Sequence, residues 1–244
     1  MIDLNSLNVK IFLDTANLDS IKKSLDQYPF IKGFTTNPSL MHKEGVKNYE
    51  SFCKKALEIS SNLPISFEVF SDNINEMEEE ARIINSWGGN SYVKIPISNT
   101  KGELTTSVIK NLTQDGIKVN ITAIFTLQQV KEIINFFEAE TPSIISVFAG
   151  RVADSGIDPI DTMLKCSNIT SKKKNIELLW ASSREILNII HAENSNSDII
   201  TIAPDILSKI KLLNKNLNDF SLETVKDFFN DAQNAGFNIQ KKDS

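Results

Sequence analysis

Histidine, cysteine and arginine are scarce in this chain: its 244 residues include two histidines, two cysteines and three arginines. Cys53 and Cys166 stand far apart with no Cys or His partner at metal-ligand spacing, so the sequence suggests neither a zinc site nor a disulfide framework. We expect both thiols to be buried as small hydrophobes. His42 and His191 fall in a predicted loop and a predicted helix, so acid–base chemistry is expected to fall to carboxylates.

An excess of positive charge and a long apolar run are also missing. The 26 basic and 31 acidic residues give a net charge of −5, which offers no general field for attracting nucleic acid or an anionic membrane. No uncharged apolar stretch reaches the roughly 18 residues of a membrane span, and residues 1–6 lack the basic start of a signal peptide. We therefore expect a cytoplasmic protein without nucleic-acid or membrane partners, in which any anionic ligand is bound locally.

The composition that is present is ordinary for a folded protein, with 41% hydrophobic and 23% charged residues. Short β-branched or aromatic runs alternate with amphipathic segments of roughly 10 to 15 residues, which is typical of βα units around a parallel sheet. No G-x-G-x-x-G follows the first run, which disfavours an open doubly wound sheet. Strands are predicted at residues 10–14, 33–35, 65–69, 92–95, 118–122, 144–148, 176–181 and 199–202.

Eight strands with intervening helices predict the fold class α/β, as a single (β/α)8 TIM barrel in one domain over residues 1–244. The barrel is expected over about residues 10–215, followed by an additional C-terminal helix at about residues 222–235. Helix starts are recognisable from their capping residues. We expect Asn17 to cap one helix, Asp72 or Asn73 to cap the helix at residues 74–86, and Thr126 to precede another.

Polar side chains gather where the predicted strands end. The active site of a barrel enzyme is built from the C-terminal ends of its strands and the loops that follow them, so these side chains are candidates for catalysis and binding. The candidates, in chain order, are Asp14, Thr35, Asn37, Glu68, Lys94, Asn120, Thr122, Ser146, Arg151, Ser182 and Arg184.

Lys94 is the most informative of them, because it places an amine within a strand that the fold buries on both faces. Burial disfavours the charged ammonium, and the neutral amine is the form that attacks a carbonyl to make a Schiff base. A structural lysine paired with Asp14 or Glu68 is the alternative. Taken singly, Asp14 is equally explained as a helix cap and Glu68 as an ion-pair partner of Lys94, but their convergence with a lysine favours catalysis.

Two of the three arginines follow neighbouring strands. In a chain with 23 lysines, an arginine at such a place is expected to serve through its planar fork of donors, which grips phosphate in two places. Arg151, Ser182 and Arg184 are therefore a candidate phosphate site, with ion pairing at helix starts as the alternative reading of the arginines. The residues alone predict a Schiff-base barrel enzyme for a phosphorylated carbonyl compound.

Five segments resemble the transaldolase family in its short form, which includes the fructose-6-phosphate aldolases. The resemblance runs from about residue 11 to residue 202, and Thr-Thr-Asn-Pro-Ser is its most specific string. It rests on Phe-Leu-Asp-Thr-Ala at 12–16, Thr-Thr-Asn-Pro-Ser-Leu at 35–40, Val-Lys-Ile-Pro at 93–96, Asn-Ile-Thr at 120–122 and Gly-Arg-Val at 150–152.

The resemblance implies roles for the candidate residues. Lys94 would form the Schiff base, Asp14 would be the acid and base for carbon–carbon cleavage, and Glu68 with Thr122 would position a proton-relaying water. The substrate would be a ketose phosphate, with no metal and no organic cofactor required. The other implied contacts are Thr35, Asn37, Asn120, Ser146 and Phe148 around the dihydroxyacetone unit, and Arg151, Ser182 and Arg184 around the phosphate.

Two positions bear on the reaction type that the resemblance implies. The aldolases of the family typically have glutamine where this chain has Glu68 and tyrosine where it has Phe148, so we expect a transaldolase of the pentose phosphate pathway. A fructose-6-phosphate aldolase is the alternative, and a non-catalytic sugar-phosphate binder is a remote one. Short members form pentamers or decamers through their C-terminal helices, so a homo-oligomer is expected, although a helix that covers its own barrel would also explain residues 222–235.

Overall fold

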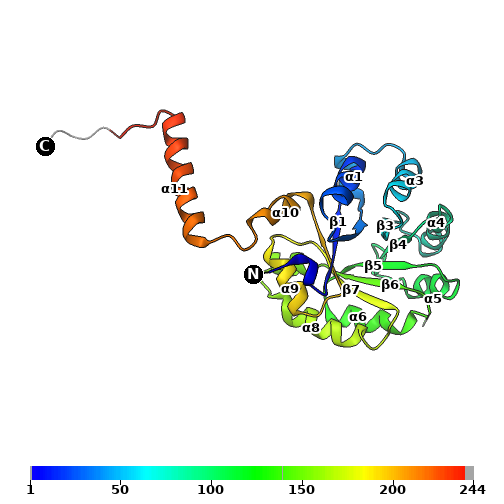
Figure 1. Ribbon diagram of the computed structural model, residues 1–244. Helices are drawn as coiled ribbons and strands as arrows, with labels where there is room; N and C mark the ends of the chain where they lie inside the picture. Colours follow the sequence, from blue (N-terminus) through cyan, green and yellow to red (C-terminus); the bar gives the residue numbers. More distant parts are fainter. Residues whose placement is uncertain (1, 139, 240–244) are drawn as a thin grey trace. The chain divides into compact units, whose positions relative to one another are not determined.

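The structure is a computed structural model that describes residues 2–138 and 140–239. Eight parallel strands close into a barrel in which each strand pairs with its sequence neighbours and the last pairs with the first (Figure 1). The predicted (β/α)8 fold class is confirmed. The strands are β1 (Lys10–Asp14), β2 (Ile31–Thr35), β3 (Ile65–Glu68), β4 (Ser91–Pro96), β5 (Val119–Ile124), β6 (Ser143–Val147), β7 (Ile176–Trp180) and β8 (Ile199–Ile202).

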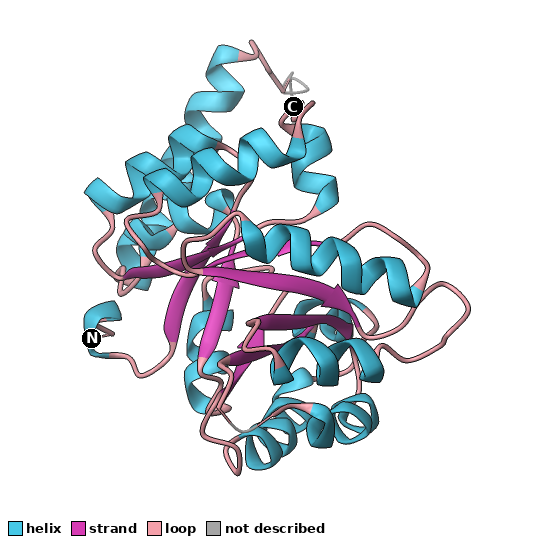
Figure 2. Cartoon of the chain, turned by 90° about the vertical axis from the view of Figure 1, so that its right-hand side faces the viewer, coloured by secondary structure: helices cyan, strands magenta, loops and turns pink. Residues whose placement is uncertain are grey.

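The α-helices between residues 18 and 208 follow the strands and lie outside the sheet, as Figure 2 shows for cyan helices around the magenta strands. Short 3-10 turns lie at Leu4–Ser6, Ile134–Phe136 and Ile210–Leu212. The α-helices are α1 (Leu18–Gln27), α2 (Pro38–Lys43), α3 (Tyr49–Ile59), α4 (Ile74–Ser86), α5 (Thr106–Gln114), α6 (Leu127–Ile133), α7 (Ala149–Asp154), α8 (Pro159–Thr170), α9 (Leu187–Asn194), α10 (Pro204–Ser208) and α11 (Leu217–Asn234).

The helix starts follow from local capping. Asn17 accepts a hydrogen bond from the backbone of Ser20 and caps α1, and Thr126 forms a capping box with Gln129 at the start of α6. Of the two candidates at α4, Asn73 is the cap, because its side chain accepts from the first backbone N–H groups of the helix. Since Asn17 caps α1, the alternative reading of Asp14 as a helix cap is wrong.

The interior of the barrel is closed below the strand ends by large side chains. Phe12 lies at the centre of a buried cluster with residues from β4, β6, β7 and β8. Gly33 makes room for it, because a Cβ at this position would lie 2.6 Å from the Phe12 ring. Since the lower interior is filled, only the C-terminal ends of the strands can surround a cavity.

The register of the strands brings the candidate residues side by side. Asp14 pairs with Thr35 across β1 and β2, Glu68 pairs with Lys94 across β3 and β4, and Lys94 pairs with Asn120 across β4 and β5. Paired residues of neighbouring strands have their side chains on the same face. The register therefore places Glu68, Lys94 and Asn120 next to one another and Asp14 next to Thr35, all near the C-terminal ends of the strands.

The chain divides into two compact units. The first is Asp3–Ser208 and contains the whole barrel, and the second contains residue 2 and residues 209–239 of the described chain. In the second unit α11 begins at Leu217, five residues before the predicted start, because Asn216 caps it. Both cysteines are buried, as predicted. Among the helices of residues 2–138 and 140–239, none combines the length and apolar character needed to cross a membrane.

Candidate active site

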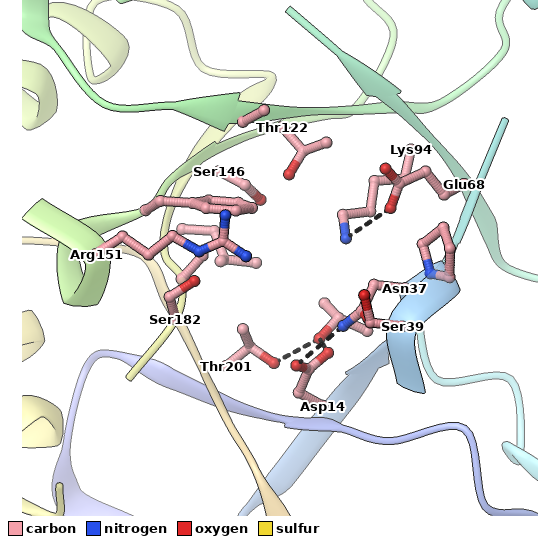
Figure 3. A pocket seen from close by; sticks show the side chains of 16 residues that line it. Asp14, Asn37, Ser39, Glu68, Lys94, Thr122, Ser146, Arg151, Ser182 and Thr201 are labelled. Atoms are coloured by element: carbon pink, nitrogen blue, oxygen red, sulfur yellow. Dashed lines mark hydrogen bonds and ion pairs between the residues drawn. The ribbon is translucent and has the colours of Figure 1, made fainter. Parts of the chain in front are cut away.

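A cavity of about 380 Å³ opens at the C-terminal ends of the strands, and every one of the eight strands contributes a residue to its wall (Figure 3). Nine of the eleven candidates at the predicted strand ends line it, and Phe148 does so as well, whereas Asn120 and Arg184 do not. The lining consists of Asp14, Thr35, Asn37, Pro38, Ser39, Glu68, Lys94, Thr122, Ala123, Ser146, Phe148, Arg151, Leu179, Ala181, Ser182 and Thr201.

Lys94 extends from β4 into this cavity and is only 7% exposed. Its Nζ lies 3.1 Å from Oε2 of Glu68 and donates a hydrogen bond of 3.0 Å to the carbonyl oxygen of Thr36. These two partners offset the cost of burying the amine. An ammonium has three donors, so one N–H position remains directed to the cavity, where a carbonyl carbon can approach.

Asp14 lies at the end of β1 on another side of the cavity. Thr35 donates a hydrogen bond of 2.7 Å to Oδ1 of Asp14, and Nδ2 of Asn37 lies 3.5 Å from Oδ2. Burial raises the pKa of Asp14 above the usual range of an aspartate, while Lys94 and the Thr35 hydrogen bond act in the opposite direction. A raised pKa makes the ionised carboxylate a stronger base, which suits a group that must accept a proton and later return it.

The side chain of Asn37 is held in place because it caps α2. Its Oδ1 accepts a hydrogen bond of 2.9 Å from the backbone N–H of Leu40 and so caps α2. Capping fixes the amide plane, and the Nδ2 donor therefore points away from the helix, toward Asp14 and the cavity. Pro38 follows as the first residue of α2, a position that suits its fixed φ and missing N–H.

The Thr122 hydroxyl is buried and makes no hydrogen bond within the described part of the chain. Buried hydroxyls are normally satisfied, so a group of this kind in a cavity wall marks a place for a ligand or an ordered water. Glu68 lines the same cavity. The Thr122 hydroxyl and the Glu68 carboxylate thus belong to the wall of one cavity.

Asn120 lies beneath the cavity and not in its wall. Its side chain is fully buried, accepts a hydrogen bond of 2.6 Å from Ser146 and donates one of 3.0 Å to Ser66. Ser146 does line the cavity, so Asn120 acts on the site by orienting that hydroxyl. Sequence reasoning missed Ser66, although its position two residues before Glu68 on the same face of β3 was a usable signal.

Arg151 extends from α7 into the cavity, and Figure 3 shows its guanidinium on the side facing Lys94. Its guanidinium carbon lies 5.0 Å from the ring centre of Phe148, and that ring packs on Phe125 at 5.6 Å. Stacking on an aromatic face holds the guanidinium plane while leaving its N–H donors free for an anion.

Arg184 is turned away from the cavity lining in this structure. Its Nε and one terminal nitrogen bind the carboxylate of Asp154 at 3.1 and 2.5 Å, and both side chains of the pair are about half exposed. The Arg184 guanidinium holds the pKa of Asp154 below its usual range. The ion-pairing alternative raised from the sequence thus describes Arg184 here, and Arg151 is the arginine in the cavity wall.

Ser182 adopts a left-handed backbone conformation with φ of 59°, which is uncommon outside glycine. The turn packs against α7 so closely that a Cβ on Gly150 would lie 1.5 Å from the carbonyl oxygen of Ser182. Ala123, another residue of the cavity wall, has φ of 60°. Strained backbone of this kind persists where surrounding structure holds it, commonly at functional sites.

Sequence reasoning also missed Thr201, which lines the cavity from β8 and contacts Thr35. A polar residue between isoleucines in a buried strand was the available signal. In the described part of the chain no three His, Cys, Asp or Glu side chains are grouped as metal ligands would be.

The family described as Transaldolase/Fructose-6-phosphate aldolase matches residues 11–242 of the chain. A protein named "Probable transaldolase" from Nitrosopumilus maritimus (strain SCM1) is 33% identical over 208 residues, which cover 83% of this chain and 87% of the relative. Another with the same name, from Thermoplasma volcanium, is 34% identical over 210 residues, covering 85% of this chain and 88% of the relative.

Solved structures of low sequence identity share the fold. A dihydrodipicolinate synthase family protein from Coccidioides immitis superposes with a TM-score of 0.57 at 12% identity, covering 83% of this chain and 68% of its own. Thiamine phosphate pyrophosphorylase from Pyrococcus furiosus superposes with a TM-score of 0.52 at 10% identity, covering 80% of this chain and 86% of its own. Family match and named relatives together indicate an enzyme of the transaldolase or aldolase type. The chain belongs to the transaldolase/fructose-6-phosphate aldolase family.

Proposed function

We propose that this protein is a transaldolase that transfers a dihydroxyacetone unit from a ketose phosphate to an aldose phosphate through a Schiff base on Lys94. The observation that carries the proposal is the position of Lys94, a buried amine directed into a cavity that also holds two carboxylates and an arginine. Sedoheptulose 7-phosphate and fructose 6-phosphate are the proposed donors, and glyceraldehyde 3-phosphate and erythrose 4-phosphate the proposed acceptors, as in the pentose phosphate pathway.

The reaction begins when Lys94 loses a proton to Glu68, whose Oε2 is 3.1 Å from Nζ. The neutral amine attacks the C2 carbonyl of the ketose, and loss of water from the carbinolamine leaves an iminium ion. The water that departs takes its second proton from the Glu68 carboxyl group. Thr122, with its unpartnered hydroxyl, is the proposed second ligand of this water.

Carbon–carbon cleavage follows, with Asp14 as the base. Asp14 removes the proton of the C4 hydroxyl, the C3–C4 bond breaks, and its electron pair enters the iminium to give an enamine. The aldose phosphate leaves with a new carbonyl at the former C4. Addition of the enamine to a second aldose phosphate reverses these steps, and hydrolysis of the iminium then releases the product ketose. No metal or organic cofactor takes part in this sequence.

Asn37 and Ser146 are proposed to hold hydroxyls of the three-carbon unit, since both line the cavity, Asn37 beside Asp14 and Ser146 on the side of Arg151 (Figure 3). Asn120 is proposed to contribute through Ser146, and Thr35 through Asp14. The phosphate is proposed to bind Arg151 and Ser182. We include Arg184 as a second guanidinium ligand, which requires it to exchange the exposed carboxylate of Asp154 for the phosphate.

Two features favour transfer over hydrolysis. Glu68 offers a carboxylate for moving protons between the imine and a bound water, and Phe148 brings no hydroxyl to the wall that would support protonation of the enamine. An enamine that is not protonated waits for an acceptor aldehyde. A fructose-6-phosphate aldolase, which releases free dihydroxyacetone, is the second candidate, because the matching family includes both activities.

The deciding experiment measures glyceraldehyde 3-phosphate release from fructose 6-phosphate with and without erythrose 4-phosphate. Release that depends on the acceptor supports transaldolase, and equal release with accumulation of dihydroxyacetone supports aldolase. Borohydride reduction in the presence of fructose 6-phosphate should convert the iminium to a stable amine and so attach a sugar-derived adduct to Lys94, and Lys94→Met should form none. A protein that binds the sugar phosphate without adduct or product would be a non-catalytic binder.

We also propose that a second copy of this chain is a partner, in a ring-like homo-oligomer. α11 supports this proposal because it is amphipathic and has no buried residue. An isolated 18-residue helix is marginal in water unless its apolar side is packed. The cytoplasmic location expected from the sequence stays a prediction.

A further inference from the structure

Thr201 is a buried polar residue of the cavity wall for which the reaction above has no use. Its side chain comes from β8, it is 6% exposed, and its Oγ1 lies 2.6 Å from Oγ1 of Thr35. Thr35 in turn donates to Oδ1 of Asp14 at 2.7 Å. Three side chains from β8, β2 and β1 thus form one short hydrogen-bonded row, which ends at the proposed acid and base (Figure 3).

The direction of the row follows from counting protons. An ionised Asp14 can only accept, so the single hydroxyl proton of Thr35 is on the side of Oδ1. The contact between the two threonine oxygens then requires that Thr201 is the donor and Thr35 the acceptor. A hydroxyl that accepts a hydrogen bond becomes a stronger donor, and its bond to a carboxylate is charge-assisted.

The backbone around Thr201 is held by the turn that carries Ser182. Ser183 donates a hydrogen bond of 2.8 Å from its Oγ to the carbonyl oxygen of Thr201. This contact fixes the backbone at the end of β8 beside the turn that follows β7, and so it holds the Cα of Thr201 at a constant distance from β2.

We propose that Thr201 is a positioning residue for Asp14, which acts by keeping the proton of Thr35 directed to Oδ1 so that Oδ2 remains available to the substrate. The proposal rests on the acid–base role of Asp14 in the proposed function. The charged groups that share the cavity with Asp14 are Glu68 on β3, Lys94 on β4 and Arg151 on α7, and none of them hydrogen bonds to Oδ1. Thr35, supported by Thr201, therefore orients Oδ1, whereas Oδ2 has only the longer contact of 3.5 Å with Nδ2 of Asn37.

The test is Thr201→Val, which keeps the branched shape and removes the hydroxyl. Without the hydrogen bond from Thr201, the Thr35 hydroxyl is a weaker donor to Asp14. This weakens its bond to the ionised carboxylate more than its bond to the protonated acid, because only the former is charge-assisted. The ionised form of Asp14 is therefore less stabilised. We expect the acid limb of the pH profile of kcat/KM to move to higher pH by about 0.2 to 0.6 unit, with kcat lowered more than KM. Thr201→Ser restores the hydroxyl and should restore the wild-type profile.

Thr141→Val is the matched control, since Thr141 is buried outside the cavity lining and its hydroxyl makes one hydrogen bond, of 2.6 Å to the carbonyl oxygen of Thr113. It should lower the melting temperature and leave the acid limb in place. If Thr201→Val does not fold, Thr201→Ala replaces it.

The outcomes separate the two proposals. A wild-type protein that releases no aldose phosphate and forms no borohydride adduct would refute the proposed function. An active wild type, together with an acid limb that Thr201→Val leaves unmoved, would refute the positioning role of Thr201 alone. A shift that Thr201→Ser does not reverse would also overturn it, because packing would then be the cause.

Discussion

Two carboxylates share the cavity with one lysine, and their surroundings differ at the level of single atoms. Glu68 holds Nζ of Lys94 at 3.1 Å, whereas Asp14 is bound by the hydroxyl of Thr35 and is affected chiefly by burial. Environments that differ in this way allow two groups of similar intrinsic acidity to take separate roles. This difference supports the proposed division of roles, with Glu68 acting at the lysine nitrogen and Asp14 at the C4 hydroxyl of the substrate.

The burial of Asp14 predicts that its ionised carboxylate lowers the folding stability of the protein. Because the pKa of Asp14 is raised in the folded state, folding stability is greatest below its unfolded value of 3.8 and falls as the pH rises through the folded value. Asp14→Asn removes the ionisable group. We expect its unfolding midpoint in urea to exceed that of the wild type at pH 7, with the difference closing toward pH 4, while kcat falls by about 100-fold or more.

Asp72→Asn is the control, because the pKa of Asp72 is shifted in the opposite direction to that of Asp14. Hydrogen bonds from Thr100 lower the pKa of Asp72, so its contribution to stability is present above its unfolded value and lost as the pH falls through the folded one. This variant should be no more stable than the wild type at pH 7 and should keep its activity. If Asp14→Asn instead behaves like Asp72→Asn, burial does not control the titration of Asp14.

Phe148 leads to a prediction about the fate of the enamine. Phe148→Tyr places a phenol in the cavity wall, where it can support protonation of the enamine and so early release of dihydroxyacetone. We expect the ratio of aldolase to transfer activity with fructose 6-phosphate to rise by about tenfold. Phe125→Tyr, on the partner ring of the aromatic pair and outside the cavity lining, is the control. An unchanged ratio in Phe148→Tyr would count against this reading of residue 148.

At the scale of elements, the phosphate site depends on how α7 meets the turn after β7. Gly150→Ala would drive a Cβ against the carbonyl oxygen of Ser182, which lies 1.5 Å from that position, so the helix and the turn must separate. This displaces Arg151 and Ser182 from each other. We expect KM for fructose 6-phosphate to rise on the order of tenfold, equivalent to about 1.4 kcal/mol of binding, while kcat changes less.

Gly156→Ala controls for the general effect of adding a methyl group near the end of α7. Gly156 has φ of 84°, so alanine is strained there, but no atom lies within 4 Å of the added Cβ. The variant should lose about 1 kcal/mol of stability and leave KM unchanged. Equal rises in KM for both glycine variants would show that the contact between Gly150 and Ser182 is not what sets phosphate binding.

The two arginines are expected to differ in their effect on phosphate binding. Arg151→Gln should raise KM for fructose 6-phosphate by about 10- to 100-fold, since charge-assisted hydrogen bonds are each worth about 1.5–3 kcal/mol. Arg184→Gln should raise it less, because Arg184 already has Asp154 as a partner in the free protein. Unphosphorylated fructose is the control substrate. Because it has no phosphate, neither Arg151→Gln nor Arg184→Gln should lower its turnover below that of the wild type. A larger rise in KM for Arg184→Gln than for Arg151→Gln would show that Arg184, and not Arg151, is the main phosphate ligand.

The elements themselves were largely predictable, because strand position follows from local patterns of apolar residues. Predicted and observed bounds agree at Lys10–Asp14 and Ile199–Ile202, and α4 begins directly after a recognisable asparagine cap. The start of α11 was missed since the apolar pattern there is strongest from Leu222 on, whereas the Asn216 cap precedes it. Local pattern therefore predicts which elements exist more reliably than where irregular ends fall.

Side-chain partners across the fold were less predictable than the elements. The pairing of Arg184 with Asp154 joins residues 30 positions apart, and the place of Asn120 beneath the wall depends on rotamers of neighbouring strands. The Thr35 and Thr201 contact spans 166 positions. Strand-end chemistry could predict which residues gather at the cavity, but only three-dimensional packing decides which of them face it.

At the scale of the whole molecule, α11 carries a row of large exposed apolar side chains. Val225, Phe228 and Phe229 are 60–70% exposed, and with Leu222 they fall on one side of the helix at helical spacing. Isolated apolar residues on a surface need no explanation, but a contiguous stripe of large ones marks an interface. A second copy of the chain is the proposed occupant.

Val225→Glu with Phe229→Glu places two charges in this stripe and should prevent assembly, because burying them without partners costs several kcal/mol each. Sedimentation should then give a mass near 27.3 kDa, where the wild type gives a multiple of it. Asn230→Glu with Asn234→Glu adds the same charges to the polar side and should leave the oligomer intact. Since every residue of the cavity wall belongs to the unit Asp3–Ser208, the dissociated protein should still release glyceraldehyde 3-phosphate from fructose 6-phosphate. A wild type that sediments as a monomer, or a double variant that still assembles, would refute the role of this stripe.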